Sequence, residues 1–290
     1  MMLVQLLVSG LALGSMYGLV ALGYHMTWAT SRTMNFSQGH VVMLGAVVAY
    51  GCHVGAGWPL AAAAVVALAA CGAFGLVVER VAVRPFFRAG SPVWLLSTIA
   101  LGIIVENVAL LTFGKDARAF PSSLALRPVF VLGAGVYPQE LLLPVVGLAL
   151  MGGTQLFYHR TSYGRQLKAV AWDGEAAALM GIHVPRAVAV AYALSSMLAG
   201  VAGLLLAPLL NVSATMGTLI GLKAFAVAII GGLTSAAGIV AAGLVYGLIE
   251  ALVAGYVSSG AREIIGFAVV IAMLVVRPWG LGGLRPARRV

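Results

Sequence analysis

The chain has 290 residues, of which 62% are hydrophobic and only 9% are charged, and its formal net charge is +9. A soluble domain carries roughly 25% charged residues, so this composition excludes a water-soluble protein and makes lipid the solvent for most of the surface. The basic residues do not gather on an amphipathic or aromatic-rich patch, which argues against nucleic-acid binding.

The first predicted membrane helix runs from Leu3 to Tyr24. Its start lacks the positive residues of a secretory signal peptide, so we expect it to be retained as a span. Gly10, Gly14 and Gly18 recur at every fourth position. Such a spacing places them on one stripe of a helix, where a second helix can approach closely.

Four further helices are predicted in the first half of the chain, after a polar break at 30–40 that reads TSRTMNFSQGH. Their expected ranges are 41–55, 59–78, 92–113 and 140–158. The third helix is expected to end at the charged pair Glu79-Arg80. A long connection, 114–139, precedes the fifth helix, and no secondary structure is predicted for it.

The second half contains a polar loop, 161–186, and four more apolar segments at 187–210, 217–232, 239–257 and 264–276. The segment 217–232 would be about 24 Å long as a helix, which is less than the ~30 Å of the hydrocarbon core. It is therefore either a short buried span or a re-entrant half-helix. The sequence thus predicts an all-α integral membrane protein, a polytopic bundle of eight or nine transmembrane helices in a single domain, 1–290.

Basic residues bias the orientation, because Lys and Arg concentrate in cytoplasmic loops. With nine crossings, the segments on the side of the 161–186 loop hold 12 of the 17 basic residues. These are Arg32, Arg80, Arg84, Arg88, Arg160, Arg165, Lys168, Arg186, Arg277, Arg285, Arg288 and Arg289. The connection 114–139 keeps Lys115, Arg118 and Arg127 on the other side. We therefore expect the 161–186 loop and the C-terminus to be cytoplasmic.

The 161–186 loop is rich in helix-forming residues, which predicts one or two short helices outside the bilayer. Asp173 is expected to cap the second helix, with Glu175 in its first turn and Gly181 ending it. The alternative is a plain connecting loop.

Four polar residues fall inside predicted membrane helices: Glu106, Asn107, Lys223 and Glu250. A charged residue at the centre of a span costs roughly 2.5–3.5 kcal/mol, so each should face protein or water and find a partner. These residues either line a solute path or form structural pairs, for instance Lys223 with Glu106 or with Glu250.

Enzymatic and metal-binding motifs are missing from the sequence. The five histidines have no metal-ligand spacing, and Cys52 and Cys71 lie in apolar runs that indicate buried small hydrophobes. No phosphate-binding loop occurs. If ATP drives this protein, another subunit must bind it.

Glu175-Ala176-Ala177 followed by Gly181 matches the E-A-A-x-x-x-G motif of ABC importer permeases. Further matching blocks occur in order along nearly the whole chain. They are Met34-Asn35-Phe36-Ser37-Gln38-Gly39, Ser162-Tyr163-Gly164-Arg165, Leu179-Met180-Gly181-Ile182, Lys223-Ala224-Phe225, Gly231-Gly232, Arg277-Pro278 and Gly280-Leu281. Together they make the chain similar to the branched-chain amino acid ABC transporter permease family, and close to the shorter of its two permease subunits.

This resemblance implies a permease subunit in which a cytoplasmic coupling loop, 159–186, contacts a separate ATPase. The ATPase-coupling residues would be Tyr163, Gly164, Arg165, Asp173, Glu175, Ala176, Ala177 and Gly181. The residues placed on the translocation path are Asn35, Gln38, Glu106, Asn107, Lys223 and Glu250. No cofactor is expected in this chain, because the ATPase would bind ATP and magnesium.

The resemblance also implies partners: a second permease subunit, two ATPase subunits and a periplasmic solute-binding protein, assembled in the bacterial inner membrane. Three features depart from the family. His40 stands where an acidic residue is expected, Trp172 and His183 are unusual in the loop, and the family's extension after the loop glycine is absent. The solute is therefore left open among branched-chain amino acids, amides, urea and aromatic acids.

Two other functions remain at this point. A secondary transporter would couple transport to protons or sodium through Glu106, Glu250 or Lys223. A scaffold or channel would allow only downhill flux, without any dependence on nucleotide.

Overall fold

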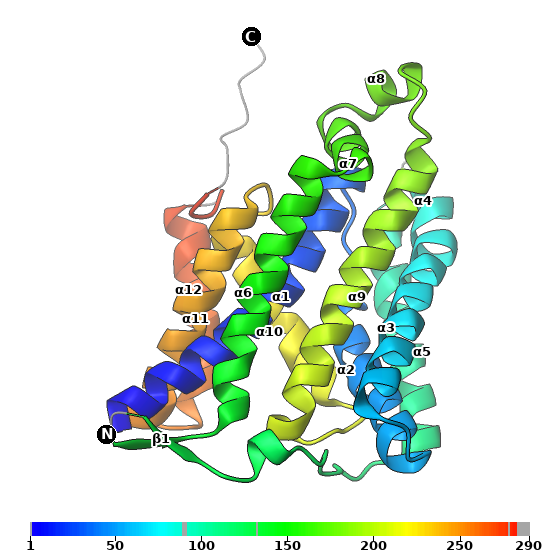
Figure 1. Cartoon of the computed structure of the whole chain (residues 1–290). Coiled ribbons are helices and arrows are strands. Elements are labelled where there is room, and N and C mark those ends of the chain that lie inside the picture. Colours follow the sequence, from blue (N-terminus) through cyan, green and yellow to red (C-terminus); the bar gives the residue numbers. More distant parts are fainter. Residues whose placement is uncertain (1, 89–91, 132, 278, 283–290) are drawn as a thin grey trace.

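The computed structural model describes residues 2–88, 92–131, 133–277 and 279–282, and helices make up most of these segments (Figure 1). The first half contains α1 (Met2–Ser31), α2 (Gln38–Tyr50) with a π-helical end (Gly51–Gly55), α3 (Leu60–Val77) with a π-helical end (Val78–Val83), α4 (Arg84–Arg88) and α5 (Trp94–Phe113). The second half contains α6 (Pro138–Arg160), α7 (Ser162–Trp172), α8 (Gly174–Leu179), α9 (Val184–Leu210), α10 (Met216–Gly231), α11 (Ala236–Tyr256) and α12 (Ala261–Val276).

Six helices in the described residues are long and apolar enough to cross a membrane. They are 2–31, 60–86, 94–113, 138–160, 184–210 and 236–256. Helix α10 is apolar but shorter, and α2 and α12 also fall below the length of those six. The expectation of an all-helical membrane bundle is therefore confirmed. The predicted number of eight or nine spans is not confirmed, because helix length and composition identify six in the described residues.

Helix α1 lies in the centre of the bundle and packs along α11 through glycine-to-backbone contacts (Figure 1). A methyl group added to Gly14 would lie 2.5 Å from the carbonyl oxygen of Gly243. One added to Gly10 would lie 3.0 Å from the carbonyl oxygen of Gly247. The predicted glycine stripe thus faces the glycines of α11, and only residues without a side chain allow the two backbones to approach so closely.

Two helices run further than the sequence predicted. Helix α1 continues past Tyr24 to Ser31 because Thr30 and Ser31 donate their hydroxyl hydrogens to carbonyl oxygens one turn earlier, at distances of 2.9 Å. The hydroxyls are therefore satisfied within the helix, and the polar residues do not end it.

The helix that begins as α3 also runs further than predicted. The sequence analysis expected it to end at Glu79-Arg80. It passes through a π-helical stretch and reaches Arg88. Glu79 is buried, and it faces Arg84 at 3.4 Å, one turn further along. Glu79 is thus neutralised inside the bundle while Arg80 is exposed, which removes the reason to expect a boundary there.

The connection 32–37 between α1 and α2 lies inside the bundle. Thr33, Asn35 and Ser37 in it are almost completely buried. Helix α2 begins at Gln38, whose amide lies against Gly23 in the middle of α1, so the chain turns back before it reaches the end of the bundle. Non-helical backbone at membrane depth is tolerated only where protein encloses it, as is the case here.

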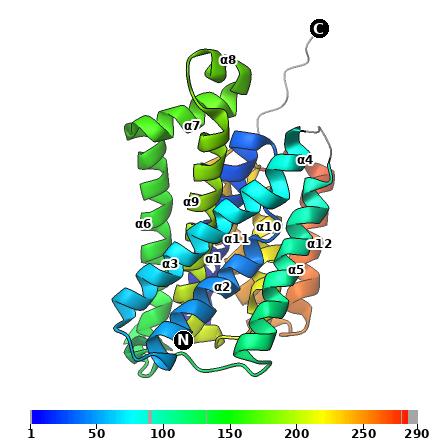
Figure 2. The same cartoon turned by 90° about the vertical axis from the view of Figure 1, so that its right-hand side faces the viewer.

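The two ends of the bundle differ. Helices α4, α7 and α8 lie at one end, and the N-terminus and the connection 114–137 lie at the other (Figures 1 and 2). The sequence analysis assigned no secondary structure to this connection, yet β1 (Val129–Val131) and β2 (Ala134–Val136) form an antiparallel hairpin in it. Arg118 also exchanges two 2.8 Å backbone hydrogen bonds with Val212, which fastens the connection to the end of α9.

The contact between α1 and α11 predicts the effect of a single methyl group. Gly14→Ala should lower the midpoint of thermal unfolding in detergent, because overpacking a close contact costs ~1–3 kcal/mol. The matched control is Gly152→Ala in α6, where an added methyl group meets nothing within 4 Å. That variant should be neutral or slightly stabilising, since alanine favours a helix over glycine. Equal midpoints for the two variants would contradict the packing described here.

Candidate functional site

Helices α7 and α8 form a small structure that stands outside the bundle. Thr161 caps α7 by accepting a hydrogen bond from the backbone N–H of Gly164 at 2.9 Å. Asp173 caps α8 by accepting from the backbone N–H groups of Glu175 and Ala176, both at 3.0 Å. The predicted cap at Asp173 and the two predicted short helices are therefore confirmed. Two caps so close together fix the angle at which α7 leads into α8.

Helix α8 ends at Leu179, and Gly181 is the stop signal that the sequence predicted. Gly181 has φ +84° and its N–H donates to the carbonyl oxygen of Ala178, while the N–H of Ile182 donates to that of Ala177. This pair of bonds is the Schellman motif, in which a glycine in the left-handed conformation satisfies the last carbonyl groups of a helix. The short helix is thus closed at both ends and stiff for its length.

Large apolar side chains on this structure project into solvent. Trp172 is 92% exposed, Leu179 is 90% exposed, and Met180 and Tyr163 are also exposed. Charged residues lie among them, namely Arg165, Lys168, Asp173, Glu175 and Arg186. A surface of exposed apolar residues within a charged rim is typical of a site that binds another protein. We call the surface of Tyr163, Trp172, Leu179 and Met180 the α7–α8 surface.

Two of the residues assigned to this region by resemblance face inward instead. Ala177 is buried and packs with Leu167, Ile182 and Ala191. Gly164 is buried against α6, where a side chain would overlap the carbonyl oxygen of Phe157. These two residues attach α7 and α8 to the bundle, while Glu175, Ala176 and Arg165 are exposed.

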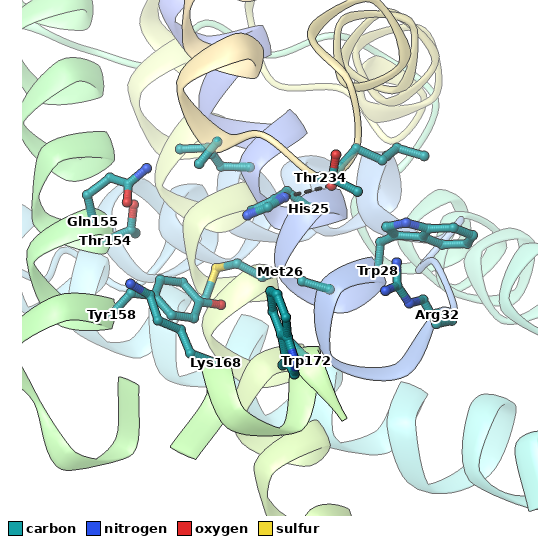
Figure 3. A pocket seen from close by; sticks show the side chains of 15 residues that line it. His25, Met26, Trp28, Arg32, Thr154, Gln155, Tyr158, Lys168, Trp172 and Thr234 are labelled. Carbon is teal, nitrogen blue, oxygen red and sulfur yellow. Dashed lines mark hydrogen bonds between the residues drawn. The ribbon is translucent and has the colours of Figure 1, made fainter. Parts of the chain in front are cut away.

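A cavity of about 390 Å³ lies beneath α7. Figure 3 shows Tyr158 and Lys168 on one side of it, Trp28 and Arg32 on the other, and His25, Met26 and Trp172 between them. Its walls come from α1, α6, α7 and the turn between α10 and α11. The cavity is mostly apolar, and it leaves α7 with free space on the side that faces α1.

The sequence analysis named Trp172, Lys168 and Arg32 but did not place them at one site, and it assigned no role to His25 or Tyr158. His25 lies 2.7 Å from the carbonyl oxygen of Leu233 through its Nδ1 atom, which ties α1 to the turn between α10 and α11. The hydroxyl of Tyr158 is buried and has no hydrogen-bond partner among the described residues. The only sequence signal for His25 or Tyr158 is a single polar residue within an apolar helix. Such a signal does not reveal which part of the protein the side chain faces.

Asn35 and Gln38, both predicted to line a translocation path, are completely buried where the connection 32–37 meets α9. Gln38 donates to the carbonyl oxygen of Ser195 at 3.0 Å, and its own carbonyl oxygen accepts from Asn35 at 3.3 Å. Asn35 also accepts from the backbone N–H of Ser37 at 3.1 Å. These amides hold the buried connection in place.

Lys223 and Glu250 are paired with each other, at 3% and 2% exposure. Arg262 of α12 joins them, with its Nε atom 2.6 Å from the same carboxylate oxygen, Oε1 of Glu250. Two positive charges therefore share one negative charge, and the cluster links α10, α11 and α12. Of the two pairings that the sequence left open for Lys223, the one with Glu250 is present and the one with Glu106 is not.

Glu106 lies in a second cavity, of about 300 Å³, between α2, α5 and α10. Its Oε2 atom accepts from the hydroxyl of Thr218 at 3.0 Å and lies 3.0 Å from Nε2 of His40. Asn107 points away from this cavity, is exposed, and donates to the carbonyl oxygen of Ile103 in its own helix at 2.8 Å. Glu106 is thus the one residue of the six path predictions that lines either of the two cavities described.

A metal centre has no support within the described ranges, because they contain no group of three His, Cys, Asp or Glu residues that could hold an ion. Cys52 and Cys71 are both unpaired, and Cys71 is buried.

Comparison with known proteins gives consistent matches over almost the whole chain. The family described as "Branched-chain amino acid transport system / permease component" matches residues 6–276. The high-affinity branched-chain amino acid transport system permease protein LivH of Escherichia coli K12 is 32% identical over 301 residues, which cover 99% of this chain and 97% of that protein. BraD of Pseudomonas aeruginosa, described in the same words, is 32% identical over 299 residues, with the same coverage of both chains.

A more distant relative is the probable branched-chain amino acid transport permease protein LivH of Methanocaldococcus jannaschii. It is 27% identical over 285 residues, which cover 92% of this chain and 88% of that protein. No solved structure gives a significant match.

The cluster of Lys223, Glu250 and Arg262 predicts that two substitutions, each of which replaces a charged side chain by an uncharged one of similar size, have unequal effects on stability. Glu250→Gln leaves Lys223 and Arg262 without a negative charge, and removing one partner of a buried pair costs ~3–5 kcal/mol. Lys223→Met leaves the pair of Glu250 and Arg262 balanced. In detergent, Glu250→Gln should therefore lower the midpoint of thermal unfolding clearly more than Lys223→Met does. The opposite order would show that the shared carboxylate does not hold the cluster together.

Proposed function

The chain belongs to the family of branched-chain amino acid transport permease components, and from this premise we propose that it is the membrane subunit of an ATP-driven importer of branched-chain or related amino acids. The α7–α8 surface is the observation that carries the ATP-driven part of the proposal. It is a stiff, capped structure with exposed apolar residues, and it lies outside the bundle. A membrane protein that moves with ATP but binds none itself needs such a contact with a separate ATPase.

We propose nine crossings in one permease domain, 1–290. The three shorter helices α2, α10 and α12 join the six long ones as spans, and α10 is a short span enclosed by its neighbours. Five of these spans precede α7, and this odd number agrees with the placement of the N-terminus and of α7 and α8 at opposite ends of the bundle (Figure 1). The Lys and Arg bias then makes the end with α7 and α8 cytoplasmic, in the inner membrane of a bacterium.

The ATPase would bind the α7–α8 surface. Leu179 and Met180 would enter an apolar groove, and Arg165, Asp173 and Glu175 would fix the register at its rim. Tyr163 and Ala176 lie on the exposed side and extend this contact. Gly164, Ala177 and Gly181 serve it indirectly, since they set how α7 and α8 attach to the bundle and where α8 ends.

Movement of the ATPase reaches the spans through packing. Ala177 and Ile182 join α8 to Ala191 of α9, and Leu167 of α7 belongs to the same cluster. The cavity beneath α7 leaves room for α7 to shift towards α1. A rigid displacement of α8 would thus bias the bundle between two arrangements, as alternating access requires.

The complete transporter would contain a second permease subunit, two ATPase subunits that bind ATP and magnesium, and a periplasmic solute-binding protein. This chain would hold no cofactor of its own. The ion-coupled alternative has weaker support, because Lys223 and Glu250 are tied to each other and to Arg262 in the packing of three helices.

Substitution of the most exposed apolar residue of α8 tests this proposal. Leu179→Asp should weaken co-purification of the ATPase subunits by roughly tenfold or more, as removal of a central interface residue does. ATP-dependent uptake in proteoliposomes should fall to the same extent. Leu179 is 90% exposed, so the fold itself should not change.

The matched control is Leu126→Asp, a residue that is 76% exposed in the connection 114–137 at the opposite end of the bundle. It should leave ATPase binding unchanged. Uptake that persists without any ATPase subunit would contradict an ATP-driven importer. Equal ATPase binding by both variants would show that the α7–α8 surface is not the docking site.

A further inference from the structure

Glu106 is a partly buried charge within α5, and no permanent cation neutralises it in the part of the chain that the structure describes. The more deeply buried carboxylates each have one. Glu79 faces Arg84, and Glu250 faces Lys223 and Arg262. Glu106 has only a histidine and a threonine as partners, and both contact its Oε2 atom. Its Oε1 atom has no hydrogen-bond or ion-pair partner within the described residues, and 23% of its side chain is exposed.

The position of Glu106 makes this unusual. It is the thirteenth residue of α5, so it lies about 18 Å along a helix that is about 30 Å long. A carboxylate at such a depth is costly unless a positive group is near it. The imidazole of His40 packs with its other nitrogen against Gly102, so this ring holds Oε2 and does not reach across to Oε1.

The cavity beside Glu106 has the lining of a small-molecule site. Phe36, Phe225 and Tyr24 form an aromatic cluster, with ring centroids 5.2 Å apart for Phe36 and Phe225 and 5.6 Å apart for Tyr24 and Phe225. Ile99, Ile103 and Leu222 complete its apolar walls. A volume of about 300 Å³ is at the small end of ligand pockets, and aromatic faces favour a cation placed over them.

We infer that this cavity is a station for the transported solute, and that Oε1 of Glu106 receives the ammonium group of an apolar amino acid. The aromatic and aliphatic walls would receive the side chain of the solute. Helix α10 begins at Met216, two residues before Thr218, so its positive end lies beside Glu106 and suits the solute's own carboxylate. The identity of the solute as an amino acid rests on the proposed function, whereas the preference for an ammonium group rests on the unpaired oxygen.

This assignment implies a weak and transient site. A single charged contact within apolar walls discriminates an amine from an acid, yet it lets the solute leave again. His40 and Thr218 are positioning residues, because they hold Oε2 and so aim Oε1 at the cavity. The loss of either one would disturb the site less than the loss of the charge itself.

The first test uses the complete transporter in proteoliposomes with leucine as the solute. Glu106→Gln keeps the size of the side chain and an acceptor oxygen but removes the charge. Leucine uptake should fall by roughly tenfold or more, while assembly with the ATPase and ATP hydrolysis stay near those of the unchanged protein. Glu106→Asp should restore part of the uptake. The matched control is Asn107→Ala, the neighbouring residue that points away from the cavity, and its uptake should be unchanged.

The second test asks for the ligand chemistry and does not depend on transport. The complex without its solute-binding protein is placed in nanodiscs, and its thermal unfolding is followed with three probes. Leucine and isoamylamine should raise the unfolding midpoint, and 4-methylpentanoate, which lacks the ammonium group, should not. Glu106→Gln should abolish both shifts.

The outcomes separate the two proposals. A transporter that imports leucine equally well with Glu106→Gln would overturn the solute station but leave the importer intact. Equal shifts with 4-methylpentanoate and isoamylamine, or no shift with any probe, would also overturn it. The absence of ATP-dependent uptake in the unchanged protein would instead refute the proposed function, and the nanodisc measurement would still decide whether Glu106 binds an amine.

Discussion

The backbone contact between α1 and α11 is the interaction on which the rest of the structure depends. Lipid chains are as apolar as the helices, so burial of apolar surface does not drive spans together as it does in water, and close packing must do so. Gly14 and Gly243 let the two helices meet at backbone distance. Helix α1 then forms the centre around which α6, α9 and α10 pack. The polar groups that this arrangement encloses have to find partners within the protein.

Local features of the sequence predicted their own structure well. The glycine stripe of α1, the cap at Asp173 and the stop at Gly181 each follow from a few neighbouring residues, and all three are present. The end predicted for α1 was wrong. In the sequence its last hydroxyl residues resemble a polar break, but in the structure they donate hydrogen bonds to carbonyl groups of the same helix. The hairpin in the connection 114–137 was missed, although Gly133, which has φ +81°, lies in its turn.

The site was predictable only in part, for a different reason. Glu106, Lys223 and Glu250 could be recognised as charges that need partners, but the choice of partner depends on which helices are neighbours and at what height. The bundle brings Lys223 to Glu250 and leaves Glu106 with His40. His40, which stands where the family was expected to have an acidic residue, thus becomes the group that holds the carboxylate.

The two functional regions make opposite demands on the same bundle. The α7–α8 surface has to be stiff, and it is, because both ends of α8 are capped and Ala177 anchors it to α9. The cavity proposed for the solute has to change its access. The walls that α2 and α5 supply lie away from the contact between α1 and α11, whereas Tyr24 of α1 and helix α10 form the side nearest to that contact. A rigid centre with movable flanks would let a force applied at α8 alter access to Glu106 without unpacking the bundle.

The most direct test of this account is the side of the membrane on which α8 lies. Leu179→Cys is labelled with a membrane-impermeant maleimide in a Cys52→Ala background, since Cys71 is buried. The account predicts labelling in inside-out vesicles and none in intact spheroplasts, with Leu126→Cys showing the reverse. Labelling of Leu179→Cys from outside intact cells would place the α7–α8 surface beyond the reach of any cytoplasmic ATPase and would contradict the mechanism.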